Sequence, residues 1–202
     1  MPQTQIDQAS KWVEILHWCQ KLLSQYDSER AKVSTQLLES ILGSPIKVNS
    51  AEAISQDPIL TESIDFPLVQ SSGFAASERE RLLSVATELT WFLSSRSHCP
   101  YAQVVGPEAP IRHTAFRLGF FILPPGTHYA NHLHVAEEIY VLISGSGSWS
   151  LDNAKFQRYG EGDLVDVASM VPHALQTEES AVLTLYTWTG HDVSFDKYRY
   201  CD

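Results

Sequence analysis

The chain has 202 residues, 44% of them hydrophobic and 19% charged, which is the composition of a soluble globular protein with one large domain or one domain and an extension. Fourteen Lys and Arg against 24 Asp and Glu give a formal net charge of −10. This balance argues against nucleic acid or an anionic membrane as a partner. It does not exclude a small anionic substrate, because a bound metal ion can reverse the charge of a pocket.

Cysteine usage and the N-terminus bear on the cellular compartment. Cys19, Cys99 and Cys201 are an odd set without a C-x-x-C pair, which predicts buried or free thiols and neither a disulfide framework nor a thiolate zinc site. The N-terminus has no basic region followed by an apolar one, so we expect no signal peptide. Apolar stretches fall short of the ~20 residues that a membrane helix needs. The expected location is the cytoplasm.

The first half of the chain, residues 1–100, has the pattern of helices. Between residues 12 and 26, apolar side chains recur three and four positions apart, which predicts an amphipathic helix. Ser28 is a suitable N-cap for a second helix. Gly43, followed by a Ser-Pro pair, is expected to end it.

A third helix is expected near the end of this half. Ser77 begins a capping box, and the apolar pattern that follows includes Trp91 and Phe92. The stretch 44–76 before it contains Pro and Ser and is poorly periodic. We expect it to wrap over the core or to contain a short helix near 51–54. No chemistry is assigned to this half of the chain.

The second half, residues 101–202, has the pattern of short strands. Five segments are rich in β-branched and aromatic residues and are separated by turn signals such as Pro-Pro-Gly. They are Ala115–Leu123, Glu138–Ile143, Ser148–Leu151, Leu164–Val167 and Ala181–Trp188. Strands of this length and spacing predict an antiparallel sandwich or barrel, on which the helical segment 1–100 would pack.

One segment of this half carries residues for chemistry. In an extended strand, His134, Glu138 and Tyr140 would share one face, because side chains alternate. His132 has the same parity, whereas Glu137 would point to the other face, toward solvent. Two imidazoles and a carboxylate on one face favour a divalent first-row metal, although a single strand histidine is more often an ordinary core or surface residue.

The spacing of these residues resembles a known family. Gly126-(x5)-His132-x-His134-(x3)-Glu138-(x6)-Gly145 is similar to the first cupin motif at every fixed position. A match of this length is far more specific than an isolated H-x-H pair.

A second stretch resembles the second cupin motif. Gly162 and His173 match its outer glycine and its histidine. The motif's Pro, inner Gly and Asn are replaced by Ala168, Met170 and Thr177, so the turn before His173 departs from the family pattern. The two motifs in order imply a mainly β fold: a C-terminal cupin barrel (a double-stranded β-helix, or jelly roll) with an α-helical N-terminal segment.

The cupin resemblance implies a set of metal ligands. They are His132, His134, Glu138 and His173. His132 is the position that some cupins leave unused. His128 and His191 lie outside the motifs and are expected at ordinary surface or core positions.

A wider set of residues narrows the family. Behind a helical N-terminal segment, the sequence resembles the cupin-type dimethylsulfoniopropionate (DMSP) lyases of marine bacteria, which cleave DMSP to dimethyl sulfide and acrylate. The matching residues are Tyr129, His132, His134, Glu138, Tyr140, His173 and Trp188. The resemblance implies a cytoplasmic carbon–sulfur lyase with one divalent metal: Zn, Fe(II) or Mn, with Co and Ni also accepted by this ligand set.

The resemblance also implies individual roles. Tyr140 would abstract a proton from DMSP, and the phenol becomes a stronger candidate base when a dication lowers its pKa of about 10. Tyr129 and Trp188 would shape the pocket, and their aromatic faces suit a sulfonium, at ~0.5–2 kcal/mol per contact. Inward Tyr and Trp side chains are also common barrel filling.

Two other functions fit a cupin, because fold does not determine function. One is an Fe(II) dioxygenase, since three His and one Glu hold iron with positions open for oxygen. The other is a non-catalytic cupin that binds or senses a small molecule. For all three, the expected partner is a small molecule, zwitterionic in the case of DMSP, and neither nucleic acid nor a membrane. Edge strands or the N-terminal helices would allow a homodimer.

Overall fold

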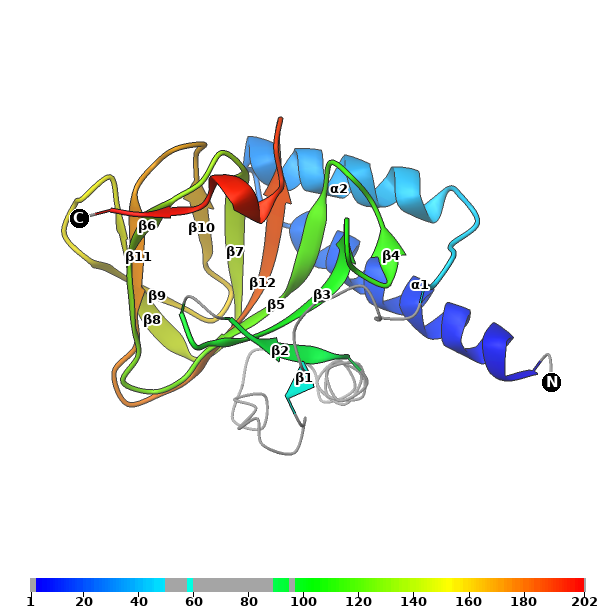
Figure 1. Cartoon of the computed structure of the whole chain (residues 1–202), viewed down its shortest axis with the longest axis horizontal. Coiled ribbons are helices and arrows are strands. Elements are labelled where there is room, and N and C mark those ends of the chain that lie inside the picture. Colours follow the sequence, from blue (N-terminus) through cyan, green and yellow to red (C-terminus); the bar gives the residue numbers. More distant parts are fainter. Residues whose placement is uncertain (1–2, 50–57, 60–88, 95–96, 202) are drawn as a thin grey trace.

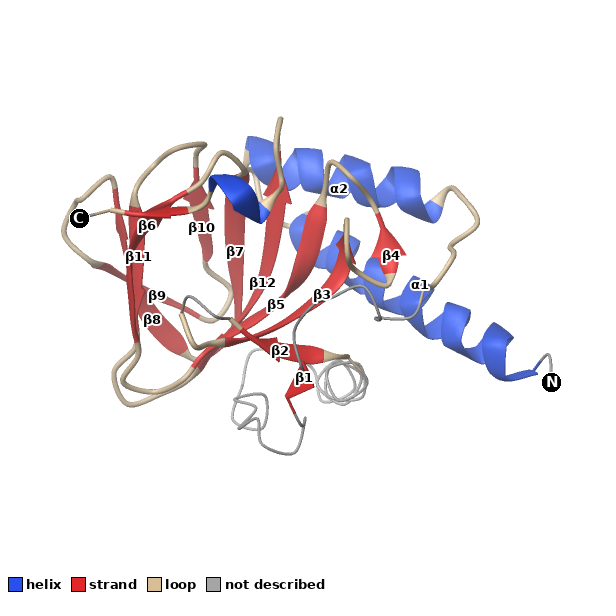
Figure 2. Ribbon diagram, in the orientation of Figure 1, coloured by secondary structure: helices blue, strands red, loops and turns tan. Residues whose placement is uncertain are grey.

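The computed structural model of the chain describes residues 3–49, 58–59, 89–94 and 97–201. Within these residues, helices α1 (Gln3–Leu23) and α2 (Glu29–Leu42) precede a series of antiparallel strands, and a short 3₁₀ helix, η3 (Phe195–Lys197), lies near the C-terminus (Figure 2). None of the described helices is both long enough and apolar enough to cross a membrane.

The described strands form two sheets that face each other without joining into one closed barrel (Figure 1). The larger sheet has the order β1 (Pro58–Ile59), β2 (Trp91–Leu93), β3 (Pro100–Gly106), β5 (Arg117–Leu123), β12 (Val182–Thr189), β7 (Glu137–Ser144) and β10 (Leu164–Val167), with β4 (Ile111–Arg112) parallel to β3. The smaller sheet has the order β13 (Arg199–Tyr200), β6 (His128–Leu133), β11 (His173–Gln176), β8 (Ser146–Leu151) and β9 (Gln157–Gly160).

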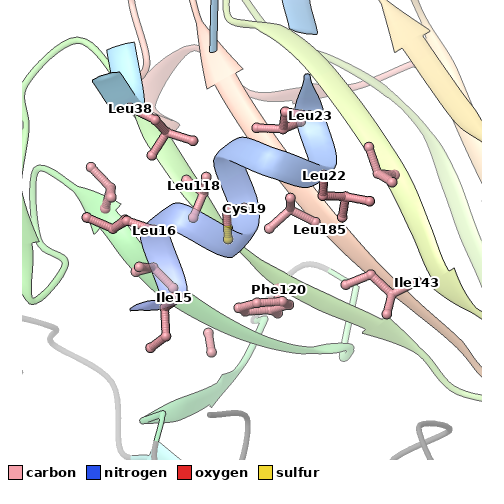
Figure 3. Close-up of a cluster of buried hydrophobic side chains, with 14 of the residues drawn as sticks. Ile15, Leu16, Cys19, Leu22, Leu23, Leu38, Leu118, Phe120, Ile143 and Leu185 are labelled. Atoms are coloured by element: carbon pink, nitrogen blue, oxygen red, sulfur yellow. The ribbon is translucent and has the colours of Figure 1, made fainter. Parts of the chain in front are cut away.

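The larger sheet is buried on both faces, which explains why its strands are almost continuously apolar. In β5, Leu118 and Phe120 point toward the helices, whereas Phe121 and Leu123 point toward the smaller sheet. Figure 3 shows the first of these two cores, in which apolar side chains of α1 and α2 pack on β5, β7 and β12. The second core lies between the two sheets and surrounds the residues singled out in the sequence.

The first two predicted helices are confirmed. Ser28 caps α2, because its Oγ accepts a hydrogen bond from the Ala31 backbone N–H at 3.3 Å. At the other end, the Gly43 N–H donates to the Glu39 carbonyl at 2.9 Å, and the helix ends at Leu42. Cys19 and Cys99 are buried free thiols and Cys201 is a partly exposed one, as expected.

The prediction of a third helix is wrong at its C-terminal end. Trp91 and Phe92 lie in strand β2, where Trp91 pairs with Ala102 of β3 and both aromatic side chains are buried. Side chains that fit an apolar helical stripe also fit a strand when a sheet edge is available. The rest of that helix, and the short helix considered near 51–54, lie outside the described residues. The boundary at residue 100 stays a prediction.

The five predicted strands are all present. Each begins and ends within two residues of the predicted position. Sequence analysis missed other strands, β3, β6 and β11 among them. Strands β6 and β11 are short and contain His, Asn and Gln, so their pattern lacks the apolar alternation that signals a strand.

Polar contacts join α2 to the strands of the larger sheet. Ser34 of α2 and Thr187 of β12 are both buried, and their hydroxyl oxygens lie 2.9 Å apart in a hydrogen bond. Arg30 of α2 donates to Asp166 of β10 at 2.6 Å and reaches Glu137 of β7 at 3.5 Å. The helix is therefore attached to three neighbouring strands of the larger sheet.

We predict that Ser34→Ala lowers the free energy of unfolding by about 1–3 kcal/mol, because it leaves the buried Thr187 hydroxyl without this partner. Urea unfolding followed by circular dichroism measures the change. Ser40→Ala, on the exposed face of the same helix, is the matched control and should change stability little. Ser34→Ala combined with Thr187→Val should recover part of the loss. Equal effects of Ser34→Ala and Ser40→Ala would contradict the prediction.

Candidate metal centre and substrate pocket

Three histidines meet between the facing sheets. His132 lies in β6, His134 lies in the turn that follows, and His173 begins β11 and pairs directly with His132 across the sheet. All three are at most 1% exposed. One ring nitrogen from each lies within 4.8 Å of the others, a spacing at which three imidazoles can share one metal ion.

Backbone carbonyls select the tautomer of these rings. In His132, His134 and His173, Nδ1 lies 2.8–2.9 Å from a carbonyl oxygen two residues away. A carbonyl can only accept, so each Nδ1 carries a hydrogen, and the neutral form of each ring has its lone pair on Nε2. Histidines that bind metals have this arrangement, in which the second nitrogen is held by a hydrogen-bond acceptor.

Glu138 of β7 adds a carboxylate to the cluster. Its Oε2 lies 3.0 Å from His134 Nε2 and 3.3 Å from His173 Nε2, and its Oε1 accepts a hydrogen bond from Trp188 Nε1 at 2.7 Å. Burial alone would raise the pKa of this carboxyl, but the hydrogen bonds and charges of His134 and His173 outweigh burial and hold the pKa below its ordinary value. The carboxylate is therefore ionised at neutral pH.

The cluster fits a divalent cation. Nitrogen lone pairs and carboxylate oxygens repel one another at these distances unless a proton or a metal ion lies between them. Nε2 of His173 is completely buried, and apart from its approach to Glu138 Oε2 at 3.3 Å it has no hydrogen-bond partner among the described residues. Burial and the neighbouring His173 lower the pKa of His132 to about 3, so its Nε2 lone pair is free of a proton at neutral pH.

His132 is held between two phenols. Its ring stacks on Tyr129 with centroids 4.3 Å apart and on Tyr198 with centroids 4.8 Å apart. Tyr198 donates its hydroxyl hydrogen to the Tyr129 hydroxyl. Sequence analysis missed Tyr198, because it follows the last long strand and belongs to no motif.

A cavity of about 200 Å³ opens beside the cluster. This is below the roughly 300–1,000 Å³ of pockets for drug-sized ligands, so it fits a smaller molecule. The predicted residues Tyr129, Tyr140 and Trp188 line it together with His132 and Glu138. Further aromatic side chains, which sequence analysis did not single out, complete the wall: Tyr101, Phe121, Tyr186, Phe195 and Tyr198.

Strand β7 accounts for the position of Tyr140. Glu138 and Tyr140 point to the same side, as strand alternation predicted, and are 3% and 4% exposed. Burial, followed by the negative charge of Glu138, raises the pKa of Tyr140 well above its ordinary value. In the metal-free chain, Tyr140 is thus a neutral phenol.

Residues expected outside the site lie outside it. The side chain of Glu137 is 38% exposed and contacts Arg30, and His128 and His191 are on the surface. His134 reaches the cluster from a turn, so the strand parity assumed for it does not apply, although its imidazole does face Glu138.

The turn before His173 shows how the chain forms the second motif with unusual residues. Met170, at the position of the family's inner glycine, has φ of +63°, a left-handed conformation that glycine adopts more readily. Thr177, at the position of the family's Asn, accepts a hydrogen bond from the Thr127 N–H and donates one to the Pro124 carbonyl. In this chain the turn thus has a left-handed non-glycine residue at Met170, and Thr177 is held by two backbone hydrogen bonds.

Comparisons with known proteins agree with this geometry. Residues 92–184 match the model of the dimethylsulfoniopropionate lyase family. The dimethylsulfoniopropionate lyase DddQ of Ruegeria pomeroyi is 27% identical over 148 residues, which is 72% of each chain.

Two solved structures have the same fold. One, from a study of the DMSP lyases RdDddP and RnDddQII, superposes with a TM-score of 0.61 at 21% identity and covers 83% of this chain and 90% of its own. The crystal structure of DddQ from Ruegeria pomeroyi gives a TM-score of 0.55 at 19% identity, with 90% and 95% coverage.

The two facing sheets have the cupin fold, which confirms the predicted fold class, and the converging histidines form a candidate metal centre. Within that fold, the chain is similar in sequence to the dimethylsulfoniopropionate lyases.

We predict that the protein binds one divalent ion per chain. His173→Ala should weaken this binding by at least about 10–100-fold, because a loss of that size is typical even when only a residue that hydrogen-bonds a metal ligand is removed. Metal analysis after dialysis against Zn, Mn, Co, Ni or, anaerobically, Fe(II) measures the content. His128→Ala, an exposed strand histidine outside the cluster, should bind as the parent does. Equal metal content in the two variants would contradict the assignment.

Proposed function

We propose that the protein is a metal-dependent carbon–sulfur lyase that cleaves DMSP to dimethyl sulfide and acrylate by β-elimination. The observation that carries the proposal is a buried phenol, Tyr140, that points with Glu138 into an aromatic pocket beside three converging histidines. The relatives named as DMSP lyases support the choice of substrate.

The proposed ligands are His132, His134, His173 and Glu138. The ring nitrogens of the three histidines lie within 4.8 Å of one another, and Glu138 Oε2 approaches two of them, at 3.0 and 3.3 Å. His173 Nε2 has no other partner among the described residues. A divalent ion held there would supply positive charge to bind the substrate carboxylate, acidify the adjacent C–H and favour the Tyr140 phenolate. This donor set accepts Zn, Fe(II), Mn, Co or Ni. Trp188 keeps Glu138 oriented through its 2.7 Å hydrogen bond.

Tyr140 acts as the general base. Its phenolate takes the proton from the carbon next to the substrate carboxylate, and the electrons of that C–H bond form the C=C bond of acrylate. The C–S bond breaks, and its electron pair leaves with sulfur as neutral dimethyl sulfide. The proton is then on Tyr140, so charge and atoms balance without an oxidant or a reductant.

The pocket walls bind the sulfonium end. A sulfonium has no N–H donors, so it gains little from hydrogen-bond acceptors and more from aromatic faces, at about 0.5–2 kcal/mol per contact. Tyr129 and Trp188 provide such faces, and the buried walls keep water away from the reacting carbon. The proposal includes a cytoplasmic location, no nucleic-acid or membrane partner, and a homodimer formed through edge strands or helices.

We predict that Tyr140→Phe lowers kcat by about 10²–10⁴-fold while metal content and folding stay unchanged. Gas chromatography of dimethyl sulfide over metal-loaded, anaerobic protein measures the rate. Tyr159→Phe, which alters a tyrosine outside the pocket wall, is the matched control and should retain activity. Full activity of Tyr140→Phe would exclude the tyrosine mechanism, and a requirement for oxygen would point to a dioxygenase instead.

We also predict that 3-(trimethylammonio)propanoate is a competitive inhibitor and not a substrate. It has the carboxylate spacing of DMSP and a methylated cation that aromatic faces bind, but a trimethylammonium group leaves less readily than a sulfonium. Steady-state inhibition of dimethyl sulfide release measures it. The matched control is 3-aminopropanoate, whose hydrated ammonium suits this pocket poorly and should inhibit much less. Equal inhibition by both compounds would contradict recognition by aromatic faces.

A further inference from the structure

The proposed reaction leaves one buried cation near the pocket without a role. Arg117 of β5 is 1% exposed and pairs with Trp188 of β12 in the sheet register. A buried guanidinium is costly unless its donors are satisfied and its charge is balanced, so its contacts show what it stabilises.

The contacts of Arg117 connect two separate parts of the chain. Its Nη1 donates to Gln103 Oε1 and to Glu108 Oε2, both at 2.8 Å, on the side of β3. Its Nε donates to the backbone carbonyl of Val193, and its guanidinium carbon lies 4.1 Å from the centroid of the Phe195 ring. A planar guanidinium can make in-plane hydrogen bonds and a cation–π contact together, whereas an ammonium cannot reproduce this geometry.

Val193 and Phe195 belong to the C-terminal segment 190–201, which closes one side of the pocket. Phe195 lines the cavity and packs edge-on against Trp188, with centroids 5.1 Å apart. Tyr198, at the end of η3, lines the cavity as well. Figure 1 shows this segment, in red, crossing in front of the strands of the larger sheet and continuing to the smaller one.

The segment is attached at both of its ends. At the far end, Tyr200 of β13 pairs with His132 of β6, and the Cys201 N–H donates to the Asn131 carbonyl at 2.8 Å. At the near end, Arg117 contacts both the Val193 carbonyl and the Phe195 ring, in addition to the packing of Phe195 on Trp188. Helix η3 lies between the two ends, and Tyr198, which follows it, contacts Tyr129 and His132.

We propose that Arg117 is a positioning residue for the substrate pocket: it holds the segment 190–201 so that Phe195 and Tyr198 enclose the cationic end of the substrate. Its pairing with Glu108 keeps this buried cation from repelling that end. The part that concerns substrate rests on the proposed lyase function, whereas the positioning of the segment does not.

The electrostatic surroundings agree with this placement. Burial is the largest influence on Tyr101 and Tyr186, and it raises the pKa of each phenol. The positive charge of Arg117 acts in the opposite direction and lowers these pKa values, and the negative charge of Glu108 raises them. Both tyrosines line the pocket, so the ion pair acts on the pocket wall with two opposed charges.

The test compares Arg117→Lys, which keeps the charge and loses the planar geometry, with Phe195→Leu, which keeps Arg117 and loses the ring. Lys197→Ala, on the exposed side of η3, is the matched control. Hydrogen exchange over residues 190–201 and the kinetic constants for DMSP are measured on metal-loaded protein. We expect faster exchange in 190–201 and a KM raised about 10-fold, with a smaller change in kcat, in the first two variants.

Each result decides between the alternatives. The proposal would be overturned if Arg117→Lys and Phe195→Leu both showed the same hydrogen exchange over residues 190–201, and the same KM for DMSP, as Lys197→Ala. If Arg117→Lys fails to fold, Phe195→Leu still tests the wall, since faster exchange in 190–201 with a raised KM supports the proposal and unchanged values overturn it. If no protein releases dimethyl sulfide, the lyase function fails, while the exchange measurement still tests the positioning of the segment.

Glu108→Gln tests the charge balance separately. It leaves the cation of Arg117 without its carboxylate partner. Binding of 3-(trimethylammonio)propanoate should weaken and binding of the anion acrylate should tighten. A uniform loss of both ligands would indicate a merely structural role for the pair and would overturn the electrostatic part of the proposal.

Discussion

The site depends on the mutual repulsion of groups that the backbone forces together. Three imidazole nitrogens converge, two of them next to the buried carboxylate of Glu138, and carbonyl oxygens at the Nδ1 atoms hold all three rings in this orientation. Such an arrangement is unfavourable in a dry interior unless a cation joins it. Metal affinity and the cost of folding without metal are therefore two consequences of the same geometry.

The helical half of the chain contributes to this geometry although it carries no reactive group. The helices cover the outer face of the sheet that holds Glu138, Tyr140 and Trp188. The alternate side chains of those strands, which point away from the site, are therefore packed against the helices. Ser34 contacts Thr187, the neighbour of Trp188, and Arg30 reaches Glu137, the neighbour of Glu138. The strand pair that positions the carboxylate is thus fixed on both faces.

The sequence was sufficient to predict the residues that lie at fixed spacings on regular strands. Glu138 and Tyr140 share a face because β7 is regular, and the motif glycines mark real turns: Gly145 has φ of +79°, and a Cβ there would lie 2.0 Å from the Ala181 carbonyl oxygen. Trp91 was misassigned because, over a strand of only three residues, an apolar pattern is compatible with a helix as well as with a strand. Tyr198 was missed because it reaches the site through long-range packing onto His132, which no local pattern encodes.

Recognition of a cation in this pocket has to come from aromatic faces. The carboxylate of the pocket, Glu138, is already engaged by Trp188, His134 and His173, so it is not available as a counter-ion for a sulfonium. The net charge of −10 belongs to the whole chain. Salt screens its field, so it contributes long-range attraction of a cation toward the protein and not binding inside the aromatic cavity. A dication bound by the histidines at one end, as proposed, and aromatic faces at the other would match a molecule with a carboxylate and a soft cation. The same requirement explains why Arg117, a buried arginine beside the cavity, is paired with the carboxylate of Glu108 and covered by the ring of Phe195.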